Sequence, residues 1–486
     1  MKDGSLGIKA VQFWLVGWAA LSPMASQTRP EAWESTVASA QRAYVAGDFG
    51  EAERLFRAAV KEAQELPSSD PRLSTSLNNL AALYDTVGRY REAEPLYRQA
   101  LALMEKTLGP SDPNVATTLN NLAELSRVRG KYAEAEALHT RALAIREKAL
   151  GPDHPDVAQS LDNMGALYYF EGRYPEAEKL YLRSLAIRQK ALGDDHPAVA
   201  QTTHNLAELY RAQGKYDKAE PLYKKALALL EKDRGPEHPD VATILGNMGE
   251  LYRLEEKYDA AEPYYKRSIG ILEKQFGDKH PTLAVALNNL GELYRGEGKY
   301  TEAESLYRRS LAIVEAKFGR EHPNLAPALN NLGELYREQS NFAESERLYL
   351  RALAILQKSF GANHPNLAVT LNNLAELYDQ QGKHAQAERL YVRSLKILEG
   401  SLEPNHSDIA AALNKLSQLY SYEGRYEEAQ PLCKRAVEIL ERNLGPDDPA
   451  VVKTQQNCSS LAEKILQQSE IKKMESHAKS LGAPQH

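Results

Sequence analysis

The stretch ALNNLGELYR occurs twice in this chain, at Ala286–Arg295 and again at Ala328–Arg337. The two copies lie 42 residues apart, and their leucines recur at the spacing of one helical face. Each copy nevertheless carries two adjacent asparagines, which are poor helix formers because their amides compete for backbone hydrogen bonds. The repetition therefore indicates a repeat architecture, and the asparagines indicate a surface with a function.

The doublet position recurs every 42 residues without insertion or deletion. A more degenerate unit precedes it at about residues 31–66. Self-similarity at a fixed period predicts an array of repeats, and 486 residues exceed the ~250–300 that a single core reaches. The doublet reads Asn78-Asn79, Asn120-Asn121, Asp162-Asn163, His204-Asn205, Gly246-Asn247, Asn288-Asn289, Asn330-Asn331, Asn372-Asn373, Asn414-Lys415 and Gln456-Asn457.

Each unit reads as two helices. In the unit at 323–360, Pro323 suits the first helical position and His322 suits the N-cap. A second helix is predicted at Ala343–Lys358. One such pair cannot bury its apolar face alone, so we expect about ten pairs to stack into a solenoid. In most copies the first helix ends at a glycine: Gly88, Gly130, Gly172, Gly214, Gly298, Gly382 and Gly424.

The ends of the chain differ from the array. Lys2 and Lys9 precede a short apolar run at residues 10–21, which predicts a signal peptide over residues 1–26 and therefore a periplasmic or secreted protein. The alternative is an amphipathic extension on a cytoplasmic protein. The array is expected at 27–450, a capping helix at 451–476 and a disordered tail at 477–486.

Composition excludes several classes of protein. A net charge of −6 argues against a general nucleic-acid binder, and no other segment is apolar enough to span a membrane. The only cysteines, Cys433 and Cys458, fall at core-facing positions of adjacent helices. Two buried free thiols are the favoured interpretation, with a disulfide as the alternative.

The small and aromatic positions carry a resemblance to a known family. Leu77-x-x-Leu80-Ala81-x-x-Tyr84, followed by Ala93, Tyr97 and Ala100, resembles a tetratricopeptide repeat. The 42-residue period looks like the long variant found in kinesin light chains, nephrocystin-3 and many bacterial proteins. The resemblance implies an all-α fold, a right-handed α-α superhelical solenoid. It also implies that the first helices line a concave surface, which often grips an extended peptide.

The asparagines lie on the face of the helix that is turned away from the core. With about 100° per residue, Asn330 and Arg337 fall within about 20° of one another, whereas the apolar residues occupy the opposite side. An amide both donates and accepts, so a row of amides is suited to the backbone of an extended peptide. The alternatives are that the amides bridge neighbouring helices or are inherited copies of one unit. The predicted peptide-binding asparagines are Asn205, Asn247, Asn289, Asn331 and Asn373.

A charged row accompanies them, in which each arginine follows a glutamate by three residues. The favoured interpretation is ion pairing along the helix, and the alternative is that the arginines bind carboxylates of an acidic peptide. The row is Glu208 with Arg211, Glu250 with Arg253, Glu292 with Arg295 and Glu334 with Arg337.

Nothing in the sequence forms a catalytic pattern. One histidine recurs per repeat, as at His322 and His364, and this spacing suits helix caps better than a shared metal. We therefore expect no metal, no cofactor and no enzymatic activity. The predicted function is a scaffold that binds a protein or an extended peptide in the concave groove. The alternatives are an assembly spacer of a cell-envelope complex and a peptide-sensing regulator of an enzyme on another chain. The sequence does not determine the oligomeric state.

Overall fold

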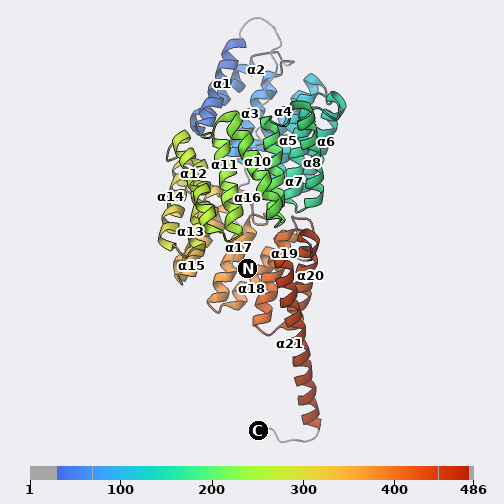
Figure 1. Cartoon of the computed structure of the whole chain (residues 1–486). Helices are drawn as coiled ribbons and strands as arrows, with labels where there is room; N and C mark the ends of the chain where they lie inside the picture. The colour runs from blue at the N-terminus through green and yellow to red at the C-terminus, as the bar shows by residue number, and fades with distance from the viewer. Residues whose placement is uncertain (1–29, 68, 447, 481–486) are drawn as a thin grey trace.

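The structure is a computed structural model that describes residues 30–67, 69–446 and 448–480 (Figure 1). Over this part of the chain, α-helices follow one another in antiparallel pairs joined by short turns. The helical repeat array predicted from the sequence is confirmed, including the degenerate first unit. The predicted signal peptide lies outside the described residues.

The first helix of a repeat usually begins at a capped proline. The His196 Nδ1 atom accepts the backbone N–H of Ala198 at 3.1 Å, and Asp112 caps its helix in the same way. A second proline, Pro327, accompanies a short 3-10 turn, η1 (Pro323–Leu325), before α15. The first helices are α1 (Pro30–Val45), α3 (Arg72–Thr86), α5 (Pro113–Val128), α7 (Pro155–Phe170), α9 (Pro197–Ala212), α11 (Pro239–Leu254), α13 (Pro281–Gly296), α15 (Ala326–Glu338), α17 (Leu367–Gln380) and α19 (Ser407–Tyr422).

The second helices are longer in most repeats and remain continuous through the prolines near their start, such as Pro95 and Pro221. Only the first turns of a helix tolerate a missing N–H at small cost, which explains this placement. These helices are α2 (Phe49–Gln64), α4 (Tyr90–Leu108), α6 (Tyr132–Leu150), α8 (Tyr174–Leu192), α10 (Tyr216–Arg234), α12 (Tyr258–Phe276), α14 (Tyr300–Phe318), α16 (Phe342–Phe360), α18 (His384–Glu399) and α20 (Tyr426–Leu444).

A single helix, α21 (Pro449–Ser480), ends the described chain and projects from the array (Figure 1). It runs to Ser480, beyond the limit of 476 expected from the sequence. Cys433 and Cys458 form a disulfide between α20 and α21, with their Cα atoms 5.7 Å apart. The favoured interpretation of two free thiols is therefore wrong. Cys433 is buried and Cys458 is half-buried, and their positions on adjacent helices bring the two sulfurs within bonding reach.

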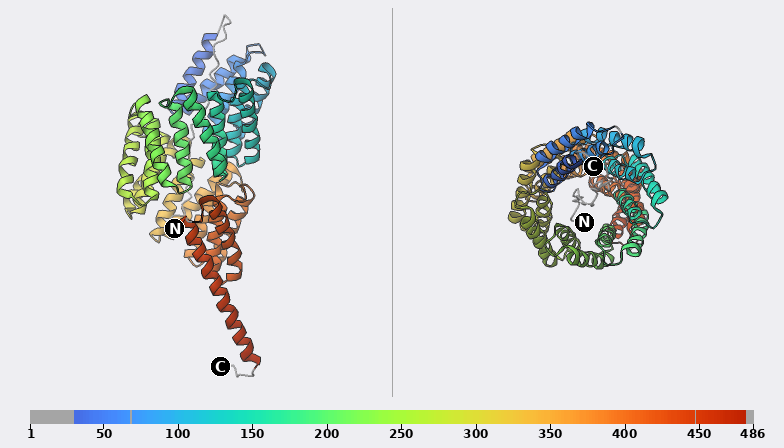
Figure 2. Two further views of the ribbon diagram at one scale, coloured as in Figure 1. Left: turned by 45° about the vertical axis from the view of Figure 1, so that its right-hand side comes forward. Right: turned by 90° about the horizontal axis from the view of Figure 1, so that it is seen from above.

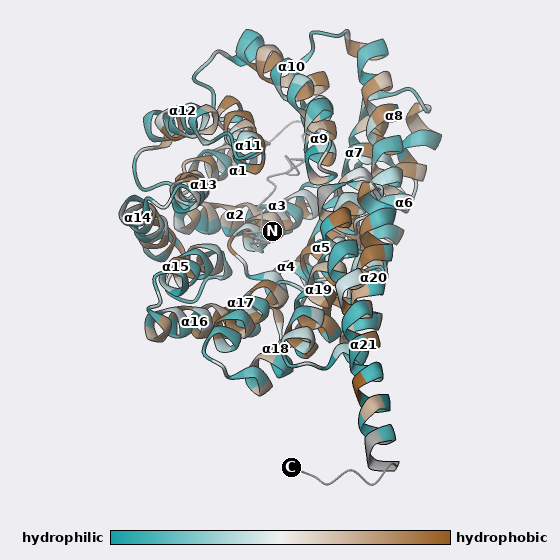
Figure 3. Cartoon of the chain, turned by 60° about the horizontal axis from the view of Figure 1, so that its bottom comes forward, coloured by the Kyte–Doolittle hydropathy of each residue, from teal (hydrophilic) through white to brown (hydrophobic). Residues whose placement is uncertain are grey.

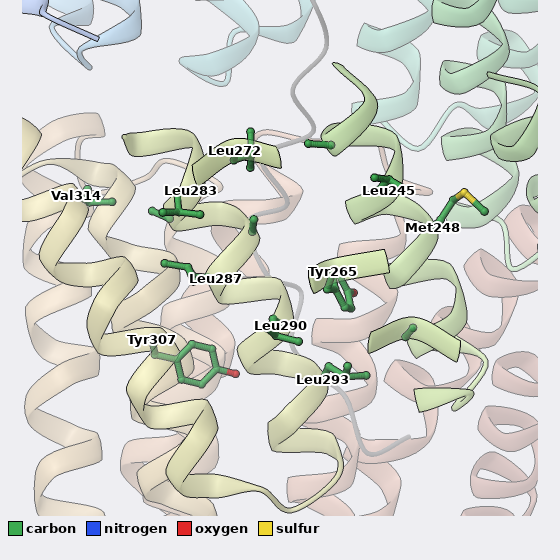
Figure 4. Packing of buried hydrophobic residues seen from close by; sticks show 14 of the residues in the cluster. Leu245, Met248, Tyr265, Leu272, Leu283, Leu287, Leu290, Leu293, Tyr307 and Val314 are labelled. Atoms are coloured by element: carbon green, nitrogen blue, oxygen red, sulfur yellow. The ribbon is translucent and has the colours of Figure 1, made fainter. Parts of the chain in front are cut away.

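The core consists of one layer of apolar side chains between the two helices of each repeat and the next repeat. Figure 4 shows this packing around Tyr265, Tyr307 and Leu290. The Tyr307 ring lies directly against Gly291, where an added Cβ would come within 2.5 Å of the ring. Tyrosines of the first helices reach the edge of the layer, as predicted: the Tyr252 hydroxyl donates to Glu220 at 2.8 Å.

The helix pairs wind into a superhelix. Seen along its axis, the chain forms a ring (Figure 2, right). The odd-numbered helices lie on the inner side of this ring and the even-numbered helices on the outer side (Figure 3). Consecutive first helices also contact one another, as α13 does with α11 and α15, because the inner layer has the smaller radius. The face that carries the asparagine doublets therefore belongs to the inner helices.

Successive turns of the superhelix touch along what we call the inter-turn seam. At the seam, the residue that ends a first helix lies against the cap of the first helix six repeats later. A Cβ added at Gly88 would lie 3.0 Å from His322 Nε2, and one at Gly130 would lie 3.2 Å from Pro365. The same register joins Gly47 to His280, Gly172 to His406 and Gly214 to Asp448.

Two capping histidines of the second turn, His364 and His406, have two hydrogen-bond partners for this reason. His364 Nδ1 accepts the N–H of Asn366 at 3.2 Å, and its Nε2 atom lies 2.8 Å from the carbonyl oxygen of Val128. His406 Nε2 lies 2.7 Å from the carbonyl oxygen of Phe170 in the same way. A carbonyl can only accept, so each Nε2 carries the proton. Cap duty was predicted, whereas the bond across the seam was not.

Aromatic rings complete the seam on its outer side. Phe49 stacks on Phe318 with ring centroids 5.5 Å apart, and Tyr90 stacks on Phe360 at 5.4 Å. Phe360 also stacks on His364 at 4.5 Å. The Phe49–Phe318 and Tyr90–Phe360 contacts each join the start of a second helix in the first turn to the end of a second helix in the next turn. The seam therefore holds the superhelix closed through both polar and apolar contacts.

Candidate functional site: the inner face

The second asparagine of each doublet forms a ladder along the inner helices. Within the predicted set, Asn205 and Asn373 are buried, whereas Asn247, Asn289 and Asn331 are half-buried. The half-buried members belong to three consecutive repeats, on α11, α13 and α15. Asn289 and Asn331 belong to the two copies of ALNNLGELYR, so the stretch that reveals the repeat also supplies part of the ladder that solvent reaches.

Some doublet residues bridge neighbouring helices. Asn121 Nδ2 donates to Asn78 Oδ1 at 3.2 Å, and Asn247 Nδ2 lies 2.8 Å from His204 Nε2. The first residue of the doublet can also reach forward, as Asn330 Nδ2 does to Thr370 Oγ1 at 3.0 Å. Bridging, the alternative considered from the sequence, is therefore observed for these residues. Contact with a peptide remains a prediction for the ladder.

The arginine row makes the ion pairs that the sequence favours. Arg211 Nη2 lies 2.6 Å from Glu208, and the equivalent N···O distances are 2.8 Å for Arg253 and 3.1 Å for Arg295. The pair of Arg337 with Glu334 follows the same pattern at 2.5 Å. All four arginines are buried.

A tyrosine from the second helix joins each pair, which sequence reasoning missed. The Tyr265 hydroxyl donates to Glu250 at 3.0 Å, and the Tyr307 hydroxyl donates to Glu292 at 2.6 Å. The only sequence signal is a tyrosine fifteen residues after the glutamate. Although burial alone would raise the pKa of Glu208, Arg211 holds it below its usual value. The Glu208 carboxylate therefore stays ionised and anchors the Arg211 side chain.

The inner face offers hydrogen-bonding groups from side chains that recur once per repeat. In the described part of the chain, no three His, Cys, Asp or Glu side chains are placed to share a metal ion. No helix among those residues is both long enough and apolar enough to cross a membrane. The geometry provides a regular inner wall of amides and of guanidinium groups that are paired with carboxylates.

Paired helices at a fixed period, wound into a superhelix, define an α-solenoid repeat protein. The Tetratricopeptide repeat family model matches at residues 36–106, 114–189, 163–232, 199–274, 240–316, 282–358, 324–400 and 408–478. The chain therefore belongs to the tetratricopeptide repeat family, and the expected fold class is confirmed.

Solved structures show the same likeness. A putative kinesin light chain of Podospora anserina with nearly identical repeats is 29% identical, over 43% of this chain and 99% of that one, with a TM-score of 0.36. BtubC (BKLC) of P. vanneervenii is 31% identical, over 42% and 91%, with a TM-score of 0.35. A Rap protein complexed with competence and sporulation factor is 17% identical, over 76% and 98%, with a TM-score of 0.51. No curated protein matches this chain.

Proposed function

We propose that this protein is a non-enzymatic scaffold that binds an extended peptide segment of a protein partner along the inner face. The observation that carries the proposal is the run of half-buried amides at Asn247, Asn289 and Asn331, one per repeat. Main-chain groups of an extended peptide are the partners that such a row fits, whatever the peptide's side chains. Membership of the tetratricopeptide repeat family supports an interaction scaffold.

The test is a triple substitution, Asn247→Ala, Asn289→Ala and Asn331→Ala, in the chain without its predicted leader. A partner is first identified by affinity purification, and its affinity is then measured by calorimetry. The matched control replaces Leu182, Leu350 and Val392 by Ala. These three side chains are exposed on the outer helices α8, α16 and α18.

We expect the inner triple to abolish binding and the outer triple to leave it unchanged. Loss of binding in the outer triple with unchanged binding in the inner triple would contradict the inner-face proposal and would place the partner on the convex surface. Circular dichroism of both variants checks that the helices remain formed.

We further propose that the protein is exported. The predicted leader supports export, and so does the Cys433–Cys458 disulfide, because such bonds persist in oxidising compartments and are rare in the cytosol. The intact mass of the native protein tests this proposal: a mature chain that still carries residues 1–26 would contradict it.

A further inference from the structure

A cavity of about 240 Å³ opens at the N-terminal edge of α9 and α11, at the end of α10. His196 and Arg234 lie exposed at its mouth, whereas Asp240, His204 and Leu230 are buried below them. The pocket lies on the free edge of the first superhelical turn. The six-repeat register of the seam would need a repeat before α1 to cover it, and the described residues contain none.

One carboxylate oxygen of Asp240 accepts no hydrogen bond in the pocket. Its side chain is 4% exposed, and Arg234 bonds to Oδ2. Oδ1 is buried without a hydrogen-bond partner. His238 Nδ1 lies 3.5 Å away, but that nitrogen already accepts the N–H of Asp240 at 3.2 Å and has no proton to give. Burial raises the pKa of Asp240 to about 6, as expected for a carboxylate short of partners.

The two preceding repeats hold an arginine in the equivalent space, whereas most other repeats carry an apolar residue there, as in Met104 and Leu272. Arg188 lies 42 residues before Leu230 and is 3% exposed. Its guanidinium donates to the Ala198 carbonyl at 2.6 Å and to Gln159 Oε1 at 3.1 Å, and it lies 3.0 Å from Asp162. One repeat earlier, Arg146 donates to the Asp156 carbonyl at 2.9 Å and to Thr117 Oγ1 at 3.2 Å. Two successive repeats thus fill this space with a buried guanidinium from their own second helix.

At the pocket, that guanidinium is missing while acceptors remain. Leu230 replaces the arginine, Gln201 stands at the position of Gln159, and Asp240 stands at the position of Ala198. The repeat therefore loses the donor and gains a carboxylate. We propose that this pocket binds an alkylguanidinium group, the side chain of an arginine in an extended peptide. The assignment of the group to a peptide rests on the proposed function, whereas the guanidinium site itself does not.

Three substitutions test the site, and each installs the residue found 42 positions earlier. Leu230→Arg copies Arg188 and should fill the pocket from within, abolishing binding. Asp240→Ala copies Ala198 and should weaken binding about 10- to 100-fold through loss of a charge-assisted hydrogen bond. Arg234→Leu copies Leu192 and should tighten binding, because it removes the internal competitor for Asp240. Asp195→Asn, an exposed carboxylate on the same edge, is the control and should bind as the wild type does.

The probes are agmatine, a pentapeptide with a central arginine between glycines, and the same peptide with lysine. Binding is followed by calorimetry. We expect both guanidinium probes to bind, and the arginine peptide to bind more tightly than agmatine and than the lysine peptide. Equal binding of the arginine peptide to the wild type, Leu230→Arg and Asp240→Ala would overturn the proposal, and so would no binding to the wild type.

An outcome in which agmatine binds as tightly as the peptide would support the guanidinium site and overturn its assignment to a peptide. The double variant Asn289→Ala and Asn331→Ala separates this proposal from the inner-face function. It should leave the arginine probe bound even where it weakens the protein partner.

Discussion

At the scale of single residues, two first helices end at a residue other than glycine. Glu256 and Ser340 have φ values of 59° and 60° where most copies have glycine. Both make the hydrogen bonds of a glycine end: the Ser340 N–H reaches the Arg337 carbonyl at 3.0 Å, and the next N–H reaches Tyr336. A side chain in the left-handed region costs about 1–2 kcal/mol.

We predict that Ser340→Gly, and equally Glu256→Gly, stabilises the protein by about 0.5–1 kcal/mol. The relief of the unfavourable backbone conformation outweighs the entropy that the more flexible glycine loses on folding. Both side chains are exposed, so no buried contact is lost. The midpoint of urea unfolding measures the effect. Gln339→Gly is the control: its φ is −82°, so glycine there should lower the midpoint. A lower midpoint for Ser340→Gly would contradict the argument.

At the scale of helices, α21 is the last element of the described residues and packs on α20. Leu461 is buried against the preceding repeat, whereas Leu466, Ile471 and Met474 are exposed. The Cys433–Cys458 bond therefore ties a helix that buries little apolar surface of its own. Closing a loop of 25 residues is worth about 3 kcal/mol in the chain-entropy model.

We predict that Cys433→Ser together with Cys458→Ser loosens α21 while the rest of the array keeps its stability. Repeats depend chiefly on their neighbours, so the effect should be confined to the C-terminal end. Hydrogen exchange measured by mass spectrometry should become faster in α21 and stay unchanged in α1 to α16. Faster exchange throughout the array would show that the disulfide holds more than its own helix.

The sequence predicts the elements well and their long-range contacts poorly. Helix pairs, glycine ends, histidine caps and the arginine–glutamate pairs all follow from spacing along one helix or its neighbour. The inter-turn seam joins residues 236 positions apart, such as His364 and Val128, and no local pattern encodes that distance. Its only trace is a run of phenylalanines, Phe276, Phe318 and Phe360, at the position that Leu108, Leu150 and Leu192 occupy in the first copies. The pocket at Leu230 was missed because an apolar residue is common at this position, as in Leu272 and Leu356, and Arg146 and Arg188 are the residues that depart from it.

At the scale of the whole molecule, the seam determines whether the superhelix is open or closed. Glycine is needed at each seam position for two reasons: it adopts the positive φ, and it leaves room for the close approach of the next turn. Gly88 and Gly130 meet the next turn, whereas Gly298 and Gly382 have the same backbone conformation with open space around them. Asparagine also tolerates this backbone conformation, so replacing these glycines by asparagine disturbs the contact between turns more than it disturbs the helix end.

We predict that Gly88→Asn with Gly130→Asn separates the turns and increases the radius of gyration measured by small-angle X-ray scattering. Gly298→Asn with Gly382→Asn is the matched control and should leave the radius of gyration unchanged, because it alters two equivalent helix ends outside the seam. Equal radii for the two double variants would show that the seam does not hold the turns together.

The buried histidines make the closed superhelix sensitive to acid. Burial at the seam lowers the pKa of His322 and of His364 to about 4, compared with 6.5 for a hydrated ring. Separated turns bind these protons more readily, so the closed form is fully favoured above pH 6.5 and loses stability as the pH falls from 6.5 towards 4. The loss reaches about 3 kcal/mol for each ring. Asp85 and Glu171, whose pKa values burial raises to about 7, respond in the opposite direction, so only a comparison between variants isolates the histidines.

We therefore predict that the wild type expands between pH 7 and pH 4.5, and that His322→Asn with His364→Asn expands less. Asparagine retains the cap and does not titrate. It also loses the ring contacts and the bond from His364 to Val128 at every pH, so the change in radius between pH 7 and pH 4.5 is the quantity compared with the wild type. His154, a half-buried capping histidine of the first turn, supplies the control: His154→Asn should expand as much as the wild type does. Scattering across this pH range measures the difference. If the double variant and the wild type expand equally, protonation at the seam does not open the superhelix, and the carboxyl groups must account for any change in shape.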